Sequence, residues 1–447
     1  MKTYDSIKEF AKSTTTAGLL RILLRLSDEN ILKLARSELK TIPYPEGREF
    51  MSKLLLLAKP VLKEACPSCR KRVLENFFVN NMVKSSKASD AFREKYGFDP
   101  PGTLVLNPSM RCNLRCYGCY TASYTKGSDM DEKLVYRILD EAKQMGIYFI
   151  VISGGEPFFN EMLFRMFEKY NDMFFQVYTN GTLLNEETVE KLCKVGNVMP
   201  CISVEGFEKE TDGRRGKGAF AKIMNAMDLL KKHGALFGFS ATATRENNDL
   251  IVCDEFIDFF VKKGCRVGWY FQYIPVGREP NLDLVPTPEQ RIARGQKLRD
   301  ARKRYPIMLS DFWNDGALIG GCIAGGRFYL NITVNGDVEA CAFAHFAVDN
   351  IKDKSLTEVL QSDYFKAVRA RQPFNRNLLR PCMIIDNPSV LRELVTLKGV
   401  HPTCPGAETI LESLADRVDE IAEEYGKLAD REWEISYKPY MNKTARG

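Results

Sequence analysis

The sequence predicts an α/β protein with a parallel β-sheet at its centre. From residue 101 onward, short runs rich in β-branched and aromatic residues alternate with amphipathic helical segments. Six such strand–helix units follow one another, which implies right-handed crossovers and therefore a closed or an incomplete barrel. Side chains with chemical roles are then expected at the carboxyl ends of the strands.

The expected strands are short, and each is separated from the next by a helix. They cover residues 103–107, 148–153, 174–179, 198–204, 236–242 and 266–274. The intervening helices are centred on Val135, Phe164, Val189, Met227 and Phe256. A further helix is expected over residues 288–304.

The residues before this core, to about Gly97, read as helical and show no strand-like alternation. Ser27 is a suitable N-cap for a helix that continues to Leu39. Pro60 interrupts the run from residue 50 to 82, so a kink or two separate helices are expected there.

After the core the pattern changes again. Asn335-Gly336 lies between strand-like runs at 328–334 and 338–343, which predicts a hairpin. Helices are expected at 355–371 and 408–431. The chain therefore divides into a helical region at 1–97, a core at 98–310 and a small α+β extension at 311–447.

The bulk composition is that of a globular protein, with 45% hydrophobic and 27% charged residues in 447. A net charge of +6 is small for this length and demands no nucleic-acid partner. No signal-peptide pattern and no membrane-spanning run is recognised, so a cytoplasmic location is expected. The 13 cysteines are then expected as metal or cluster ligands or free thiols, not disulfides.

Cys112, Cys116 and Cys119 share one short loop directly after the first expected strand. A [4Fe–4S] cube held by three protein thiolates keeps one iron open to a small-molecule ligand, whereas an electron-transfer cluster normally has four. The alternative is a structural zinc site, which requires a fourth ligand and usually paired Cys-x2-Cys motifs.

The Cys-x3-Cys-x2-Cys spacing resembles the signature of the radical S-adenosylmethionine (SAM) superfamily. Gly154-Gly155-Glu156-Pro157, after the second strand, is similar to the family motif that receives the methionine amino group of SAM. Thr179-Asn180-Gly181, after the third strand, resembles another SAM-binding segment, which makes Asn180 a candidate contact. The order of these motifs along consecutive strand ends is more specific than any one of them.

Ser203-Val204-Glu205-Gly206, after the fourth strand, resembles the family's Ser-Leu-Asp-Gly segment, with Glu205 in place of Asp. The resemblance implies that Ser203 and a following arginine contact SAM. Arg215 is the candidate for the SAM carboxylate, with Arg214 as the alternative, because a guanidinium binds a carboxylate in a bidentate fashion.

The resemblance implies a partial (β/α)6 TIM-like barrel that holds a [4Fe–4S] cluster on the three cysteines. It also implies that SAM is cleaved to a 5′-deoxyadenosyl radical, which abstracts hydrogen from a substrate. A small electron donor of the flavodoxin or ferredoxin type is the expected partner. Tyr270, Gln272 and Asp311 are candidates on the substrate side, although packing explains them equally well.

Four later cysteines form a second group: Cys322, Cys341, Cys382 and Cys404. The pattern Cys-x13-Gly-x4-Cys resembles the start of the SPASM and twitch extensions of radical SAM enzymes. With only four cysteines, the resemblance implies a twitch-like domain with one auxiliary [4Fe–4S] cluster. A zinc site and four unrelated cysteines are the alternatives, and His345 or His401 could replace a cysteine ligand.

Three classes of function stay open. The first is an enzyme acting on a peptide or small metabolite, although no strand pattern typical of a peptide-binding domain precedes Thr103. The second is an enzyme acting on a lipid chain at the membrane surface, since basic residues lie among leucines at 19–39. The third is a non-catalytic iron–sulfur or zinc protein.

The remaining cysteines suggest less chemistry. Cys66-Pro67-Ser68-Cys69 is half a metal site with no second pair nearby, and it is interpreted as unmetallated. Four more cysteines lie among apolar neighbours without ligand spacing and are interpreted as core residues: Cys193, Cys201, Cys253 and Cys265.

Overall fold

The protein is described here by a computed structural model that covers residues 24–42, 44–124, 127 and 129–440. Its centre is a run of parallel strands, each paired with the next. They are β1 (Thr103–Leu106), β2 (Phe149–Ile152), β3 (Phe174–Thr179), β4 (Val198–Val204), β5 (Gly238–Ala243), β6 (Val267–Gln272) and β7 (Met308–Asp311). The six predicted strands are confirmed, and β7 is an additional strand.

Helices connect these strands: α8 (Glu132–Gln144), α9 (Met162–Lys169), α10 (Glu186–Val195), α11 (Glu208–Arg215), α12 (Ala219–His233), α13 (Asp254–Lys263) and α14 (Pro288–Arg304). The predicted helices are present, and α11 is an additional one. In α8 the Asp131 side chain accepts hydrogen bonds from the Lys133 and Leu134 amides and so caps the helix. Val135, Ile138 and Ala142 recur on one buried face, which packs α8 against the sheet.

The sheet continues beyond β1 through β8 (Asn331–Ile332), β9 (Asp337–Glu339), β10 (Phe346–Asn350) and β11 (His401–Pro402). β8 is parallel to β1, and the following pairs are antiparallel. The eleven strands stay in one open order from β11 to β7, so the predicted partial barrel is confirmed. The expected domain boundary at 310/311 falls on the last residues of β7.

The predicted N-terminal helices are present, and the described residues before Thr103 contain no strand. The helices are α3 (Asp28–Leu34), α4 (Arg36–Thr41), α5 (Pro45–Glu64), α6 (Pro67–Arg72), the wider π-helix η1 (Val73–Lys84) and α7 (Ser85–Tyr96). Ser27 caps α3, but that helix ends at Leu34. Residues 19–23 of the stretch considered for membrane contact lie outside the described part.

The expectation that Pro60 divides the run into two helices is wrong, because α5 continues through it. A proline removes one amide donor, and the loss is small where the packed face continues on both sides. Here Leu57 and Leu62 are both buried. The break comes instead at Ala65 and Cys66, whose backbones are extended.

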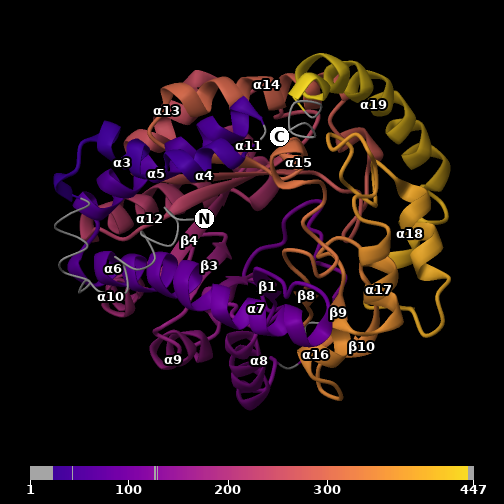
Figure 1. Ribbon diagram of the computed structural model, residues 1–447, viewed down its shortest axis with the longest axis horizontal. Helices are drawn as coiled ribbons and strands as arrows, with labels where there is room; N and C mark the ends of the chain where they lie inside the picture. The colour runs from indigo at the N-terminus through magenta and orange to yellow at the C-terminus, as the bar shows by residue number, and fades with distance from the viewer. Residues whose placement is uncertain (1–23, 43, 125–126, 128, 441–447) are drawn as a thin grey trace.

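The C-terminal segment, orange to yellow in Figure 1, packs beside the open sheet, and its last described residues reach α5, where the Tyr437 hydroxyl donates to Glu46 (2.9 Å). It holds α15 (Gly316–Ile319), α16 (Leu356–Leu360), α17 (Asp363–Ala370), α18 (Pro388–Val395) and α19 (Ala415–Ser436). Short 3-10 turns are η2 (Pro157–Phe159), η3 (Leu282–Leu284) and η4 (Ala407–Ile410). The predicted hairpin is confirmed, the helix at 355–371 is two helices, and the last helix begins later than predicted.

In the described part of the chain, every helix is too short or too polar to cross a bilayer.

Candidate active site

The loop that carries Cys112, Cys116 and Cys119 follows β1 and packs against the residues that follow β2. The Gly155 amide donates to the Ser109 carbonyl (3.0 Å), and the Glu156 amide donates to the Arg111 carbonyl (2.8 Å). A Cβ at Gly155 would collide with that Arg111 carbonyl oxygen. Glycine is therefore required because two backbones meet here.

The three sulfur atoms line the same cavity. The Leu114 amide donates to Cys112 Sγ (3.4 Å), and Thr121 Oγ1 lies 3.4 Å from Cys119 Sγ. Burial raises the pKa of the Cys112 and Cys116 thiols, so metal binding must displace their protons. Three half-buried thiols on one loop fit a [4Fe–4S] cube that keeps one iron open for SAM.

Glu205 joins the two arginines that the sequence singled out. Its Oε1 accepts from Arg215 Nε (3.0 Å) and Nη2 (2.5 Å), and its Oε2 accepts from Arg214 Nη1 (2.8 Å). Arg214 also donates to the carbonyls of Tyr117 (3.1 Å) and Gly118 (3.3 Å) in the cysteine loop. The acid at position 205 therefore places both guanidinium groups at the cavity wall beside that loop.

The carboxylate of Glu156 lies behind the cavity wall. It accepts hydrogen bonds from the Asn180 amide (2.7 Å), from Thr179 Oγ1 (2.7 Å) and from the Phe158 amide (3.1 Å). Burial raises the pKa of this carboxyl group, and the three donors oppose that rise. Glu156 thus ties the end of β2 to the end of β3.

Asn180 and Ser203 both line the cavity. The Asn180 side chain donates to Asn113 Oδ1 in the cysteine loop (2.9 Å), and Ser203 Oγ lies 3.2 Å from Ser240 Oγ. These residues, with Gly154, Gly155 and Arg215, are brought to one end of the barrel as the sequence predicts.

Arg278 is a residue of this site that the sequence analysis missed. Its Nη1 donates to the Cys116 carbonyl (3.0 Å), and its amide donates to the Cys119 carbonyl (3.1 Å). Gly277 has a φ of +81°, and a Cβ there would collide with the Cys119 carbonyl oxygen. The available signal was its position shortly after the sixth strand, where the other motifs of the barrel also lie.

The candidate substrate-side residues separate in the structure. Tyr270 is fully buried in the core, and its hydroxyl donates to the Ile251 carbonyl (3.0 Å). Gln272 and Asp311 do line the cavity, and Arg294 holds both, at 3.1 Å and 2.8 Å. Tyr270 is therefore a packing residue, whereas Gln272 and Asp311 belong to a polar network held by Arg294.

The cavity has a volume of about 840 Å³ and extends through the interior of the barrel. At one end it reaches the three cysteines. At the other it passes the first residues of the strands, Thr103, Phe149 and Phe174, and reaches the N-terminal helices. The helical residues there are Gly47, Phe50, Met51, Leu54, Leu57, Ala58 and Val61 of α5 and Val73 and Phe77 of η1.

In the second cysteine group, Cys322, Cys341 and Cys382 come together. Burial raises the pKa of the Cys322 thiol, and negative charge on the other two sulfurs would raise it further. Tyr329 Oη lies 3.3 Å from Cys341 Sγ. Cys404 is also buried, and its Sγ lies 3.4 Å from His345 Nδ1.

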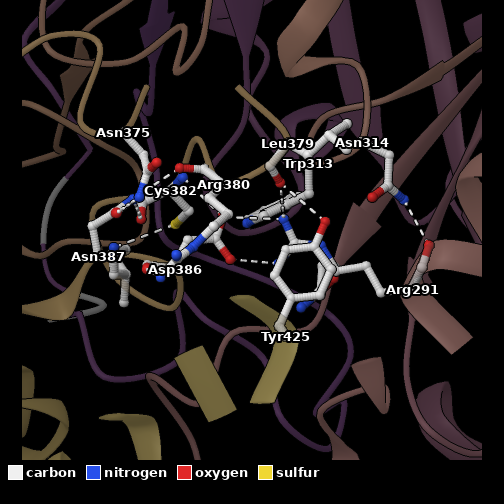
Figure 2. Close-up of polar contacts among 12 residues, drawn as sticks. Arg291, Trp313, Asn314, Asn375, Leu379, Arg380, Cys382, Asp386, Asn387 and Tyr425 are labelled. Carbon is white, nitrogen blue, oxygen red and sulfur yellow. Dashed lines mark hydrogen bonds and ion pairs between the residues drawn. The ribbon is translucent and has the colours of Figure 1, made fainter. Parts of the chain in front are cut away.

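A buried ion pair fixes the Cys382 loop (Figure 2). The Cys382 amide donates to Asp386 Oδ2 (3.0 Å), and Arg291 of α14 forms a bidentate pair with the same carboxylate (2.5 and 3.0 Å). The Arg291 guanidinium lies 3.7 Å from the centre of the Tyr425 ring of α19. A charge pair removed from water needs such added partners, so the loop is held against two helices.

His345 and His401 differ in their suitability as ligands. Burial lowers the pKa of His345 to about 4, so its ring is neutral at pH 7, and its Nε2 has no hydrogen-bond partner among the described residues. His401 is exposed, and its Nε2 lies 3.8 Å from Asp337 Oδ1. The hypothesis of a histidine ligand therefore applies better to His345.

Comparisons with known proteins agree with this geometry. A family model for the radical SAM superfamily matches residues 106–249, and one for the iron–sulfur cluster-binding SPASM domain matches residues 322–383. The chain is a radical SAM enzyme with a SPASM domain. Its cofactors are therefore SAM, the [4Fe–4S] cluster that binds SAM, and auxiliary iron–sulfur chemistry in the SPASM domain. The non-catalytic alternative is set aside.

Curated relatives cover most of this region. Mycofactocin maturase MftC of Mycolicibacterium smegmatis is 29% identical over 301 residues, which are 64% of this chain and 74% of the relative. The AdoMet-dependent heme synthase of Methanosarcina barkeri is 26% identical over 299 residues, 60% of this chain and 85% of that protein.

Solved structures share the fold. Streptococcus suis SuiB bound to S-adenosylmethionine has a TM-score of 0.56 at 21% identity and covers 67% of this chain and 76% of its own. The anSMEcpe protein with bound AdoMet has a TM-score of 0.52 at 17% identity, covering 73% of this chain and 99% of its own. At this identity the likeness concerns the fold alone.

Proposed function

We propose that this radical SAM enzyme abstracts hydrogen from a long apolar chain of the lipid type. The single observation that carries the proposal is the apolar cavity that runs from the cysteine loop to α5. Cys112, Cys116 and Cys119 would hold a [4Fe–4S] cluster that, when reduced, would cleave SAM to the 5′-deoxyadenosyl radical. We assign the electron that reduces this cluster to a small donor protein of the flavodoxin or ferredoxin type.

Residues around the cysteine loop would bind SAM. Arg215 is proposed to bind the SAM carboxylate, for which its guanidinium must share or exchange its contact with Glu205. The backbone at Gly154 and Gly155 would receive the methionine amino group. Asn180 and Ser203 would complete this end of the cavity.

The rest of the barrel interior favours an apolar substrate. Because side chains alternate along a strand, each strand presents every second residue to the cavity. In β6 these include Val267, Trp269 and Phe271, and on the other side of the barrel β2 and β3 contribute Phe149 and Phe174 at the end near α5. The interior of a TIM-type barrel is normally filled by such side chains, so an open lumen is a place for a ligand.

Helix α5 extends the apolar wall beyond the strands. Its cavity-facing residues recur three or four positions apart, as in Gly47, Phe50, Leu54, Leu57 and Val61. Such a stripe normally packs against a core, but among the described residues it lines the cavity. A flexible hydrocarbon chain is the ligand that matches a long wall with few hydrogen-bond partners.

A peptide is the second candidate substrate, and the relatives favour it. The matched relatives include mycofactocin maturases, and one SuiB structure of the same fold contains the precursor peptide SuiA. A peptide would need partners for its backbone groups, and the residues that α5 and η1 contribute to the cavity are all apolar.

Deuterium transfer can test the proposal. The full-length enzyme, reconstituted anaerobically and supplied with SAM and a reductant, would be given vesicles of phospholipid with perdeuterated acyl chains. We expect deuterium in the 5′-deoxyadenosine, because the radical takes its hydrogen from the chain bound in the cavity. Deuterium from a labelled peptide library but never from acyl chains would contradict the lipid proposal and support the peptide.

A pair of substitutions tests whether the substrate binds in the cavity. Leu54→Glu puts a charge on the apolar wall and should reduce the transfer at least about tenfold, because unpaired burial of a carboxylate costs several kcal/mol. Lys63→Glu places the same side chain on an exposed position of α5 and should keep the transfer. Equal loss in both variants, with cluster iron intact, would count against the cavity as the substrate site.

A further inference from the structure

A third group of cysteines lies outside both iron–sulfur regions. Cys66 is the N-cap of α6, Cys69 lies within α6, and Cys193 lies near the end of α10. Their three Sγ atoms all lie within 4.8 Å of one another. From the sequence, the first two were interpreted as an unmetallated half of a metal site and Cys193 as a core residue, because it lies among apolar neighbours without ligand spacing.

The backbone around these thiols is built to bring α6 against α10 and α12. The Cys66 amide donates to the Gly234 carbonyl (2.8 Å), and the Ser68 hydroxyl donates to the Cys193 carbonyl. A Cβ at Gly196 would lie 2.6 Å from the Ser68 carbonyl carbon, so glycine is needed for this close approach.

The spacing of the sulfur atoms favours a single ion over a cluster. Thiolates at about 2.3 Å from a tetrahedral zinc ion lie about 3.8 Å apart, a separation that fits three sulfurs lying within 4.8 Å of one another. A cube of four irons holds its thiolates farther apart. In agreement, neither of the two groups assigned to clusters is gathered this tightly in the described part of the chain.

We propose that Cys66, Cys69 and Cys193 bind one thiophilic metal ion, with zinc as the expected ion. Three thiolates occupy three tetrahedral positions, and the fourth is assigned to water. Cys66 and Cys193 are partly exposed, so an ion has access to the group, and Cys69 is buried. Because Cys-x2-Cys supplies two ligands and a distant helix the third, the ion would cross-link the N-terminal helices to the barrel.

The site has a structural consequence for the cavity. η1 begins four residues after Cys69, and its Val73 and Phe77 line the end of the cavity that lies away from the cysteine loop. α5 ends two residues before Cys66 and forms the adjacent wall. A metal ion bound by the α6 cysteines would therefore hold α5 and η1, which line this end of the cavity, in place. This consequence does not depend on which substrate the enzyme takes.

Metal counting on the full-length holoenzyme tests the site. With both clusters reconstituted, we expect about one zinc ion per chain, or one iron ion beyond the cluster iron. Cys69→Ser and Cys193→Ser should each lose that ion and keep the cluster iron. Cys265→Ser, which removes a buried thiol elsewhere in the core, should keep it. No additional ion in the unmodified enzyme, or its retention in both ligand variants, would overturn the proposal.

Measurements on the unsubstituted protein test the same site even if the cysteine variants fail to fold. After chelation, Co²⁺ added to the holoenzyme should produce thiolate-to-metal charge-transfer absorption and raise Tm, and the Cys193→Ser variant should bind Co²⁺ at least about 100-fold more weakly. The ion should also protect Cys66, Cys69 and Cys193 from alkylation. A disulfide within this group of the native enzyme, or alkylation unaffected by chelation, would overturn the metal site.

Discussion

At the scale of single residues, the cavity wall beside the cysteine loop depends on one carboxylate shared by two arginines. Glu205 is almost fully buried, yet it pairs with both Arg214 and Arg215. A glutamate is one methylene longer than the aspartate typical of this position. Its two oxygens each accept from a different guanidinium group, so both arginines are oriented before SAM binds.

Arg215→Lys tests the role assigned to this residue. Lysine keeps the charge but loses the bidentate geometry, so the Kd for SAM should rise about 10- to 100-fold. The measurement is equilibrium binding of SAM to the reconstituted enzyme. Arg165→Lys, on the exposed face of α9, is the matched control and should leave the Kd unchanged. A larger effect of Arg214→Lys would reassign the carboxylate to that residue.

Glu339 gives the SPASM domain a pH-dependent contribution to stability. Burial raises the pKa of this carboxyl to about 7, although Tyr124, Thr403 and Asn331 donate to it. Its folded pKa lies above the unfolded value of about 4.5, so the folded state binds more protons between these values. This contribution is complete below pH 4.5 and is lost as the pH rises through 7.

Glu339→Gln should therefore flatten one part of the stability profile. The free energy of unfolding of the native sequence should fall between pH 5 and 7 by at most about 1.4 kcal/mol per pH unit from this group. The glutamine variant should lack that slope. Urea unfolding at a series of pH values measures it, and an identical slope in both proteins would contradict the assignment.

At the scale of elements, α5 is unusual because, in the described part of the chain, part of its apolar face lines the cavity. Leu62 is fully buried against the core, whereas Leu54 is partly exposed and lines the cavity. The energetic cost of truncating a side chain includes the cavity that the truncation creates. Truncating a side chain that already lines a cavity creates little new empty volume, so this part of the cost should be small.

The two leucines of α5 should accordingly differ in stability. Leu62→Ala should reduce the free energy of unfolding by about 2–5 kcal/mol, and Leu54→Ala should cost clearly less. Thermal or urea unfolding of the full chain provides the comparison. Equal losses would indicate that Leu54 is packed like a core residue and that the lumen is closed in solution.

At the scale of the whole molecule, the two iron–sulfur regions share one sheet. β1 lies between β2 and β8, so the SAM-binding loop and the SPASM hairpin begin from neighbouring strands. Tyr120 of the first loop and Phe343 beside Cys341 are in ring contact, with centroids 4.9 Å apart. The two regions therefore form one packed unit.

Iron counting tests whether the second group holds a cluster of its own. A variant with alanine at Cys112, Cys116 and Cys119 should retain about four irons and four sulfides per chain. Because the remaining cysteines lie on separate loops of a folded domain, loss of the first cluster should leave them in place. Clearly fewer than four irons would argue against one complete auxiliary cube, and clearly more would indicate a further cluster.

The barrel, the cysteine loop and most of the other candidate site residues were predictable from local sequence patterns. Strands such as 174–179 and 198–204 were bounded correctly because buried parallel strands are short apolar runs between helices. The cysteine loop and Gly154-Gly155 were found because their spacing is local in sequence. Arg278 was missed, since its position shortly after the sixth strand is a weak signal that by itself does not distinguish it from a surface arginine; the fold places it beside Cys116.

The sequence by itself determined the family chemistry, because three cysteines within eight residues and a series of strand-end motifs already imply a SAM-binding cluster. Tertiary structure decided what depends on distant segments meeting. It placed Cys193 beside Cys66 and Cys69, buried Tyr270 in the core, and opened the barrel lumen to α5. These features depend on how helices pack across the chain, and periodicity within one segment carries no information about its partner.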